Sequence, residues 1–386
     1  MRIAHVFLNY PNRYQPYNDR LIQRLETGGV KCFVYAFSGN HADSHHVTYL
    51  RETYFRYFWY LLRSLMHFKN VLKYASVCNE TVLKGALRWG RYSLITRNNP
   101  GVIHIHHMQV LNSHFLKFLE LKKIPWIISL RGFETAIQPL LNKDYYDHVK
   151  SVLSSANGIH TVSEDLKQRA LALGASGDRI NVIKRTVEVE KAIERVVSFG
   201  ESPIMLTSIG RFNWKKGFVF LLQAIRILVD DNIPVVLNLC GDGDEKEQAE
   251  IRYWIWLLNL EHFVVLHGFL DSNGLSKVLA KTHVYIQPSI NEGIPNTLLR
   301  ALINRIPIVA SDVDGIPEVV LDNIHGVLVP PGQPTALAEG VKRIIEDEKL
   351  RQTIASAPLS VSLNPQLEVT MYKKFYTNLI NINTEP

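Results

Sequence analysis

Cysteine and long apolar runs are both scarce in this 386-residue sequence. The three cysteines, Cys32, Cys78 and Cys240, have no CxxC spacing and form no paired framework, so we predict reduced, buried thiols, as is typical of cytosolic proteins. No stretch reaches the ~18 uninterrupted apolar residues of a membrane helix. The opening MRIAHVFLNYPNR turns polar after a few apolar residues, which predicts a first strand and not a signal peptide.

Signatures of several enzyme classes are missing as well. Neither half has a first strand that leads into GxGxxG with an acid downstream, which argues against a nucleotide-dependent oxidoreductase. No Ser-His-Asp arrangement, close carboxylate pair or DxD-type metal site is recognisable. His104 and His106 share one face of a predicted strand and His107 follows, but no carboxylate or cysteine stands near them in sequence. We therefore expect strand-end histidines, with His106 lining a cleft, and no metal.

Basic charge is concentrated in residues 51–97. This segment holds nine lysines and arginines and two acids, so its net charge of +7 equals that of the whole chain. It also holds ten aromatic residues. One interpretation is a folded helical face whose basic side chains reach into solvent. The other is a patch that lies on an anionic membrane or holds an anionic acceptor. Nucleic acid is the weakest alternative, because no RNP, helix-turn-helix or zinc pattern accompanies the charge.

Strand-like and helix-like stretches alternate along the chain. This order is typical of parallel βαβ units with helices on both faces of a sheet, and it restarts in the second half. The length suits two domains, and we place the boundary within residues 187–202, with a first domain at 1–190 and a second at 191–365. The last stretch, 366–386, is predicted to be a helix that crosses back to the first domain. Ligands of such sheets bind beyond the carboxyl ends of the strands, so we expect a site in the cleft between two facing domains.

The stretch SIGRFNWKKGF, residues 208–218, places two cations on a loop that leads into a helix. Arg211 and Lys216 lie between Gly210 and Gly217. Two point charges beside a helix N-terminus are suited to a diphosphate. A solvated basic loop is the alternative.

The stretch EGIPNTLL, residues 292–299, places a carboxylate ahead of a helix start. Gly293 permits close backbone approach, and Pro295 suits the entry to a helix. The first-turn amides then point toward a ligand that carries hydroxyls and phosphates together. The alternative, a capping box, needs the acid inside the helix, and Glu292 precedes it.

These motifs resemble those of the retaining glycosyltransferases of the large family 4 group. The matching pieces are SIGRFNWKKG, CGDGD, VVLHGF, VYIQPSINEGIPNTLL, RIPIVASDVDGIPEVV and HGVLVPPG, in the family's order across residues 204–346. The first half matches more loosely, through GVIHIHHMQ, ISLRGFE and SANGIHTVSEDLKQR. The resemblance implies the GT-B fold, in which two Rossmann-like doubly wound α/β domains face each other across a cleft.

The resemblance also implies roles for single residues. Arg211 and Lys216 would hold the diphosphate and stabilise the leaving group, and Glu292 would accept sugar hydroxyls. The other implied donor contacts are Gly210, Leu270, Gly293, Ile294, Pro295, Asn296, Thr297, Leu298 and Arg300.

Three departures from the family pattern stand out. Arg300 occupies the place of a second glutamate that accepts the ribose hydroxyls, and a guanidinium has no acceptor, so we predict weaker ribose recognition. Arg131 replaces a histidine before a glycine. The glycine-rich loop after the first strand reads YPNRYQPYNDR, which makes Tyr10, Arg13 and Tyr17 candidates for the acceptor.

The expected activity is transfer of a hexose, with retention, from a UDP-sugar such as UDP-glucose to a polysaccharide or lipid-linked glycan. No cofactor or metal is expected, because Arg and Lys replace the divalent cation in this family. We expect a cytoplasmic protein, peripheral at the membrane. The alternative is a non-catalytic nucleotide-sugar-binding scaffold, which Arg300 makes plausible.

Overall fold

The computed structural model describes residues 1–12, 15–39, 47–51, 53–186, 193, 195, 197–200 and 202–382. The chain divides into two compact units. The N-terminal unit comprises residues 1–162, 166–185 and 365–386, and the C-terminal unit comprises residues 163–165 and 186–364. The predicted boundary at 190/191 lies outside the described residues.

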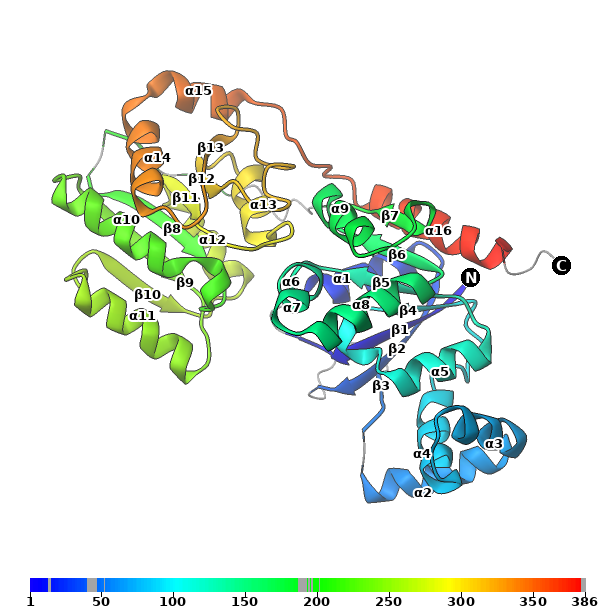
Figure 1. The fold of residues 1–386 in the computed structure, drawn as a ribbon. Coiled ribbons are helices and arrows are strands. Elements are labelled where there is room, and N and C mark those ends of the chain that lie inside the picture. Colours follow the sequence, from blue (N-terminus) through cyan, green and yellow to red (C-terminus); the bar gives the residue numbers. More distant parts are fainter. Residues whose placement is uncertain are drawn as a thin grey trace. The chain divides into compact units, whose positions relative to one another are not determined.

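The N-terminal unit is built on a seven-stranded parallel sheet with the order β3-β2-β1-β4-β5-β6-β7 (Figure 1). Its strands are short and largely buried, as expected for a parallel sheet covered on both faces. Their bounds are β1 Arg2–Asn9, β2 Lys31–Ser38, β3 Val47–Tyr49, β4 Val102–Ile105, β5 Trp126–Leu130, β6 Gly158–Thr161 and β7 Ile180–Val182.

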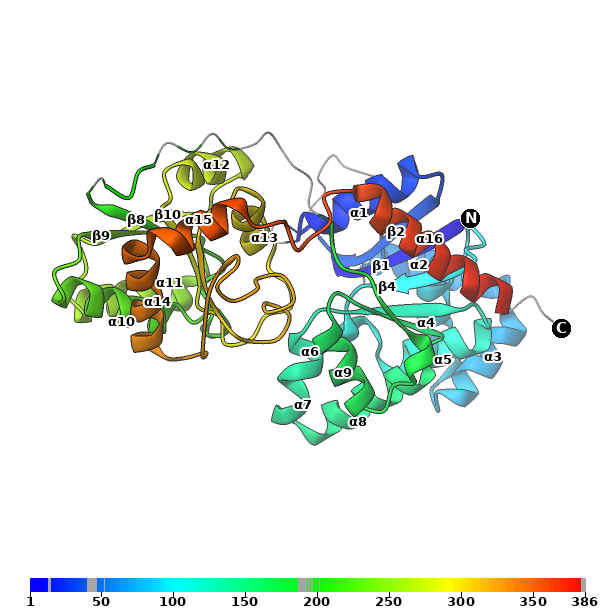
Figure 2. The same cartoon turned by 90° about the horizontal axis from the view of Figure 1, so that it is seen from above.

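Helices cover both faces of this sheet. One face packs on α1 (Tyr17–Thr27) and on the C-terminal α16 (Pro365–Ile382), which Figure 2 shows crossing the sheet. Arg24 of α1 and Glu368 of α16 form an ion pair of 2.8 Å, which ties these two helices together. The other face packs on α4 (Val82–Ser93), α5 (Ser113–Lys122), α8 (Lys143–Ser155) and α9 (Glu164–Ala172). The remaining helices of the unit are α2 (Tyr54–Leu65), α3 (Phe68–Val77), α6 (Phe133–Ala136) and α7 (Gln138–Leu141).

The C-terminal unit has a six-stranded parallel sheet with the order β10-β9-β8-β11-β12-β13. The strands are β8 Ile204–Ile209, β9 Val235–Cys240, β10 Val264–Gly268, β11 Val284–Gln287, β12 Ile308–Ser311 and β13 Gly326–Val329. One face packs on α10 (Phe218–Asp230), α11 (Glu245–Leu257), α14 (Pro334–Glu346) and α15 (Glu348–Ser356). The other packs on α12 (Ser272–Ala280) and α13 (Asn296–Ile303).

Both sheets confirm the predicted α/β class with two Rossmann-like parallel-sheet units. The alternation of apolar and helical segments predicted most of the elements but missed β3 and α15. The three cysteines are free, as predicted, but only Cys240 is fully buried, and Cys32 and Cys78 are half-buried. Among the described helices, none is long and apolar enough to cross a bilayer.

Candidate functional site

The loop after β8 lies at the carboxyl edge of the C-terminal sheet. It carries Arg211, then a short 3-10 turn over Trp214–Lys216, and it reaches α10 through Gly217. Gly217 has φ +70°, a left-handed conformation that side chains rarely adopt, and a Cβ there would lie 1.9 Å from the Pro288 carbonyl oxygen. Only glycine therefore lets this loop pack directly on the end of β11, the strand beside β8.

Lys216 and Glu292 meet at this edge although 76 residues separate them. The Lys216 ammonium donates to the Glu292 carboxylate, and the two side chains are 15% and 19% exposed. The pair is therefore shielded from bulk water but still reachable by a ligand. It joins the two stretches, 208–218 and 292–299, that the sequence singled out separately.

Backbone contacts hold the Glu292 loop in place. The Ile290 amide donates to the Lys215 carbonyl over 2.7 Å. The Asp314 carboxylate accepts from the Glu292 amide and from the Asn291 side chain, each over 2.6 Å. Asp314 stands in the resembling stretch RIPIVASDVDGIPEVV, but nothing in the sequence marked it as a support for Glu292.

Helix α13 begins directly after this loop. Pro295 is its N-cap residue, and no side chain of the described chain caps the helix, so the capping-box alternative for Glu292 is wrong. The first-turn amides belong to Asn296, Thr297 and Leu298. The Thr297 hydroxyl accepts from Tyr285 over 3.0 Å, which orients this turn against β11. Gly293 and the buried Ile294 lie within the same loop.

Arg211 has a carboxylate partner that the sequence did not reveal. Its Nε and one terminal nitrogen each donate to Glu247 over 3.2 Å, and the Arg211 side chain is 45% exposed. Glu247 also closes a capping box with Asp244 at the start of α11. The end of the stretch CGDGDE thus caps α11, and Glu247 also fixes the position of the Arg211 side chain.

Arg300 lies on α13 and reaches α12. It donates to the Ser272 carbonyl over 2.8 Å and to the Ser276 hydroxyl over 2.6 Å. Leu270, just before α12, is half-buried against the apolar cluster of that sheet face. Arg300 therefore fastens α12, an arrangement that the single-residue departure could not predict.

The predicted acceptor residues all belong to the N-terminal unit, and Arg13 lies outside the described part of the chain. Tyr10 and His106 are each 1% exposed, so neither lines an open surface, contrary to the expectation. Tyr17 and Arg131 keep part of their surface. Arg131 donates to the Tyr17 hydroxyl and, over 3.0 Å, contacts Nδ1 of His106.

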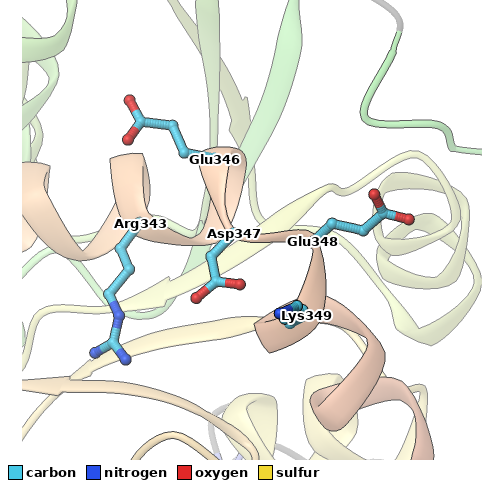
Figure 3. Close-up of a pocket in the computed structure, with 5 residues that line it drawn as sticks. All are labelled: Arg343, Glu346, Asp347, Glu348 and Lys349. Atoms are coloured by element: carbon cyan, nitrogen blue, oxygen red, sulfur yellow. The ribbon is translucent and has the colours of Figure 1, made fainter.

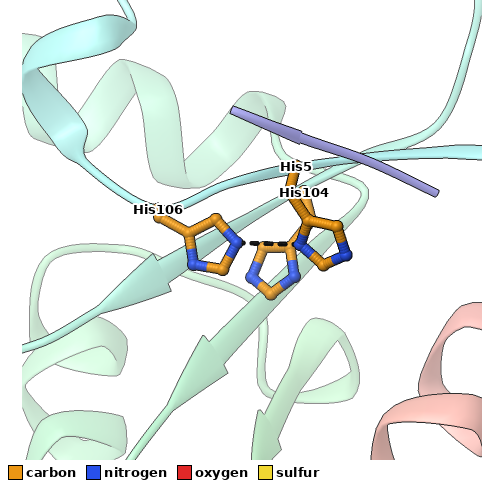
Figure 4. Close-up of side chains that lie close together, drawn as sticks. All are labelled: His5, His104 and His106. Atoms are coloured by element: carbon orange, nitrogen blue, oxygen red, sulfur yellow. Dashed lines mark hydrogen bonds between the residues drawn. The ribbon is translucent and has the colours of Figure 1, made fainter. Parts of the chain in front are cut away.

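Behind Arg131 lies a histidine cluster, which we define as His5, His104, His106 and His160 (Figure 4 draws the first three). Ring nitrogens of His5, His104 and His106 lie within 4.8 Å of one another. Both nitrogens of His104 already have partners at 2.7 Å, the hydroxyls of Tyr376 and Ser129, and the Arg131 cation stands beside His106. These contacts fit a hydrogen-bonded core network better than a metal site. Burial lowers the pKa of His5 and of His160 to about 3.

We expect acid to weaken the N-terminal unit selectively. An unfolded histidine takes up a proton below about pH 6.5, whereas His5 and His160 stay neutral in the fold until about pH 3. Stability is therefore fully present above pH ~6.5 and falls by up to about 1.4 kcal/mol per histidine for each pH unit below it.

Hydrogen exchange at pH 7 and 5.5, corrected for the intrinsic rate, measures this loss. Peptides of β1, β4, β5 and β6 should lose protection relative to β8, β9, β11, β12 and β13, which serve as the internal control. Equal losses in both units would contradict the assignment.

A surface hollow lies elsewhere, at the junction of α14 and α15 (Figure 3). Its lining is charged: Arg343, Glu346, Asp347, Glu348 and Lys349. Asp347 caps α15 by accepting from the Leu350 amide over 2.9 Å. The hollow shares no residue with the Lys216–Glu292 site, and its charges serve the helix ends.

Comparisons with known proteins define the class. The family model for glycosyl transferases group 1 matches residues 189–357, and the model for glycosyltransferase family 4 matches residues 16–191. The amylovoran biosynthesis glycosyltransferase AmsK of Erwinia amylovora is 29% identical over 193 residues, 48% of this chain and 47% of AmsK. The putative teichuronic acid biosynthesis glycosyltransferase TuaC of Bacillus subtilis is 24% identical over 263 residues, 66% of this chain and 64% of TuaC. The matches thus span about half to two thirds of these relatives.

Among solved structures, HepE of Anabaena in complex with UDP and glucose shares the fold. Its TM-score is 0.70 at 16% identity, over 98% of this chain and 99% of that one. The chain therefore belongs to the GT-B glycosyltransferases of family 4, and the resemblance drawn from its motifs is confirmed.

Proposed function

We propose that the protein is a retaining hexosyltransferase that uses a nucleoside diphosphate sugar. One observation carries the proposal: Lys216, Glu292 and the first turn of α13 converge at the carboxyl edge of β8 and β11. A cation, a carboxylate and helix N-terminal amides together match a ligand with a diphosphate next to sugar hydroxyls. Family membership supports the same reading.

In the proposed donor complex, Lys216 turns from Glu292 to the diphosphate. Arg211, which pairs with Glu247 of α11, adds a second positive charge. The amides of Thr297 and Leu298 donate hydrogen bonds to phosphate oxygens, and Glu292, released by Lys216, accepts hydrogen bonds from sugar hydroxyls. Gly210, Asn296 and the 293–295 backbone line the same donor, with Leu270 near the base.

The proposed reaction breaks the bond between the anomeric carbon and the diphosphate oxygen. The acceptor oxygen bonds to that carbon on the same face, and its proton passes to the departing phosphate oxygen. No separate base is then required. Catalysis rests on stabilising the charge that develops on the leaving diphosphate, which Lys216 and Arg211 supply in place of a metal ion.

We propose a UDP-hexose as donor and a polysaccharide or lipid-linked glycan as acceptor. HepE was solved with UDP and glucose, and the names of AmsK and TuaC refer to amylovoran and teichuronic acid biosynthesis. These relatives supply the basis for the choice, since no residue described above selects uracil or glucose.

Calorimetric titration with UDP, GDP and ADP tests the proposal, followed by donor hydrolysis and by the anomeric configuration of the product. We expect micromolar binding of one nucleotide and slow hydrolysis of its sugar, unaffected by EDTA. The alternative is a non-catalytic nucleotide-sugar-binding scaffold, which is based on Arg300 in place of the second glutamate. Binding without any hydrolysis or transfer would favour the scaffold, and binding of none of the three would reject both.

Arg300 leads to a prediction about ribose recognition, written here for UDP. Because a guanidinium cannot accept hydrogen bonds, the protein should bind UDP and 2′-deoxy-UDP within about threefold of each other. Arg300→Glu supplies an acceptor and should raise this preference for UDP by about tenfold.

The ratio of the two affinities separates recognition from a loosened α12. Ser276→Ala removes a partner of Arg300 without adding a carboxylate, so it should leave the ratio unchanged. If wild type preferred UDP over 2′-deoxy-UDP by more than about tenfold, a charged or buried polar group would already form a hydrogen bond with the ribose 2′-hydroxyl, which would contradict the prediction.

A further inference from the structure

We propose that the protein docks on an anionic bilayer through an exposed apolar face of α2. The inference adds to the proposed function but does not depend on it. We define the α2 face as the side chains that share this exposure: Phe55, Phe58, Trp59, Leu62, Leu65 and Met66. These side chains are 45–80% exposed.

The spacing of these residues places them on one side of the helix. Steps of three and four residues return to the same face of an α-helix, and Met66 follows Leu65 at the C-cap. The opposite side buries Tyr60 and Ser64, each 3% exposed. A Cβ on Gly90 of α4 would lie 2.0 Å from the Tyr60 carbonyl oxygen, so α2 and α4 are in backbone contact there. The α2 face is therefore the outer side of a helix that is already packed.

The neighbouring helices add to the exposed apolar surface. Phe68 and Leu72 on α3 are 53% and 41% exposed, and Leu83 on α4 is 61% exposed. Figure 1 shows α2, α3 and α4 grouped in one lobe beside α5, within the N-terminal unit. Large exposed apolar patches on otherwise ordinary surfaces mark binding sites.

The arginines of this lobe point inward and act as internal fasteners. Arg63 donates to the Ser93 hydroxyl over 2.8 Å, and Arg91 donates to the Leu50 carbonyl over 2.8 Å. Arg56 donates to the Tyr49 carbonyl, and Arg88 pairs with Glu80. These arginines therefore stabilise the fold of the lobe. They are not available as a surface patch for an anionic membrane.

The lysines remain at the surface. Lys69, Lys73 and Lys84 are exposed. Glu80 is the only acid in the sequence of residues 53–93, and its carboxylate is already engaged by Arg88 and lies 3.0 Å from His114. The surface of the lobe therefore combines apolar side chains with unbalanced positive charge.

That combination favours an anionic bilayer over a protein partner. Tryptophan and phenylalanine suit the boundary between headgroups and acyl chains, and lysines beside them suit anionic headgroups. The ring of Trp59 adjoins those of Phe55 and Phe58, with centroid distances of 6.4 and 5.8 Å, respectively. Each large apolar side chain that leaves water contributes more than a lysine near the surface, so salt should weaken the binding without abolishing it.

Flotation of the full chain with vesicles tests the proposal without any donor. We compare vesicles of phosphatidylglycerol mixed with phosphatidylcholine and vesicles of phosphatidylcholine alone. The α2 variant carries Phe55→Ser, Trp59→Ser and Met66→Ser. The matched control carries Tyr253→Ser, Trp256→Ser and Leu257→Ser on α11, whose side chains are 54%, 62% and 45% exposed.

We expect wild type and the α11 control to float with the mixed vesicles, and the α2 variant to lose about tenfold or more in partitioning. Replacing Lys69, Lys73 and Lys84 by glutamine should reduce binding to the mixed vesicles only. Brominated lipids should quench wild-type tryptophan fluorescence, and Trp59→Phe should remove that quenching. Circular dichroism and the thermal unfolding midpoint check that each variant is folded.

Three results would overturn the proposal. In the first, wild type stays unbound with both kinds of vesicle. In the second, the α2 variant floats like wild type. In the third, wild type is a dimer by sedimentation equilibrium, the α2 variant is a monomer, and quenching is absent, which would assign the face to a second copy. Failure of donor binding would leave the vesicle result intact, so the two proposals are tested separately.

Discussion

Lys216→Ala is expected to lower the rate of donor hydrolysis and transfer by about 10²–10³-fold. Its ammonium pairs with Glu292 and its side chain is 15% exposed, and a charge in so shielded a place interacts more strongly than one in water. Removing it withdraws stabilisation from the leaving diphosphate and also leaves the Glu292 carboxylate without its partner. Turnover of the selected UDP-sugar, with affinity for UDP measured in parallel, gives both effects.

A lysine outside the site provides the control for this variant. Lys342 pairs with Asp231 on the surface of the same unit, so Lys342→Ala should leave turnover within about twofold of wild type. Arg211→Ala should cost less than Lys216→Ala, because Arg211 is 45% exposed. Full activity of Lys216→Ala would remove the central residue of the proposed mechanism.

Gly217→Ala is expected to have the largest effect on stability, about 2–4 kcal/mol, and to weaken UDP binding. Two costs combine. A left-handed φ of +70° disfavours any Cβ, and this Cβ would lie 1.9 Å from the Pro288 carbonyl oxygen. The Lys216 loop must then move off the end of β11, which carries the Lys216 ammonium away from Glu292. Unfolding midpoints and calorimetric affinity measure the two consequences.

Gly268→Ala separates the two costs within the same sheet. Gly268 has φ +66°, but nothing lies within 4 Å of the added Cβ. This variant should lose only about 1 kcal/mol and keep its UDP affinity. Equal stabilities of Gly217→Ala and Gly268→Ala would contradict the close contact between the Lys216 loop and the end of β11.

Much of the fold was predictable because parallel sheets impose their pattern locally. Buried strands read as short apolar runs, and the helices between them show their own period, so the order of elements follows from residue types. Helix α15 was missed because its sequence, EKLRQTIAS, is mostly polar and only Leu350 and Ile354 are buried. The short β3 was missed because its three residues, Val47–Tyr49, do not form an apolar run.

From the sequence, only those parts of the site that lie within a single motif could be predicted. Lys216 and Glu292 were both identified, but their direct pairing depends on the adjacency of β8 and β11, which spacing does not encode. Glu247, in the first turn of α11, and Asp314, in the loop after β12, support the site, and their own sequence positions do not reveal these contacts. Arg300 was recognised as a departure, yet its partners on α12 are known only from the structure.

The Lys216–Glu292 pair also bears on product release. In the proposed reaction the sugar leaves with the acceptor, so the Glu292 carboxylate would no longer have sugar hydroxyls from which to accept hydrogen bonds. It then competes with the spent nucleotide for the same ammonium, and re-forming the pair lowers the free energy of the empty site. The site would therefore bind the donor more tightly than free nucleotide, and only part of this difference would come from contacts to the sugar. Glu292→Gln removes the competing carboxylate and should increase product inhibition by UDP relative to wild type.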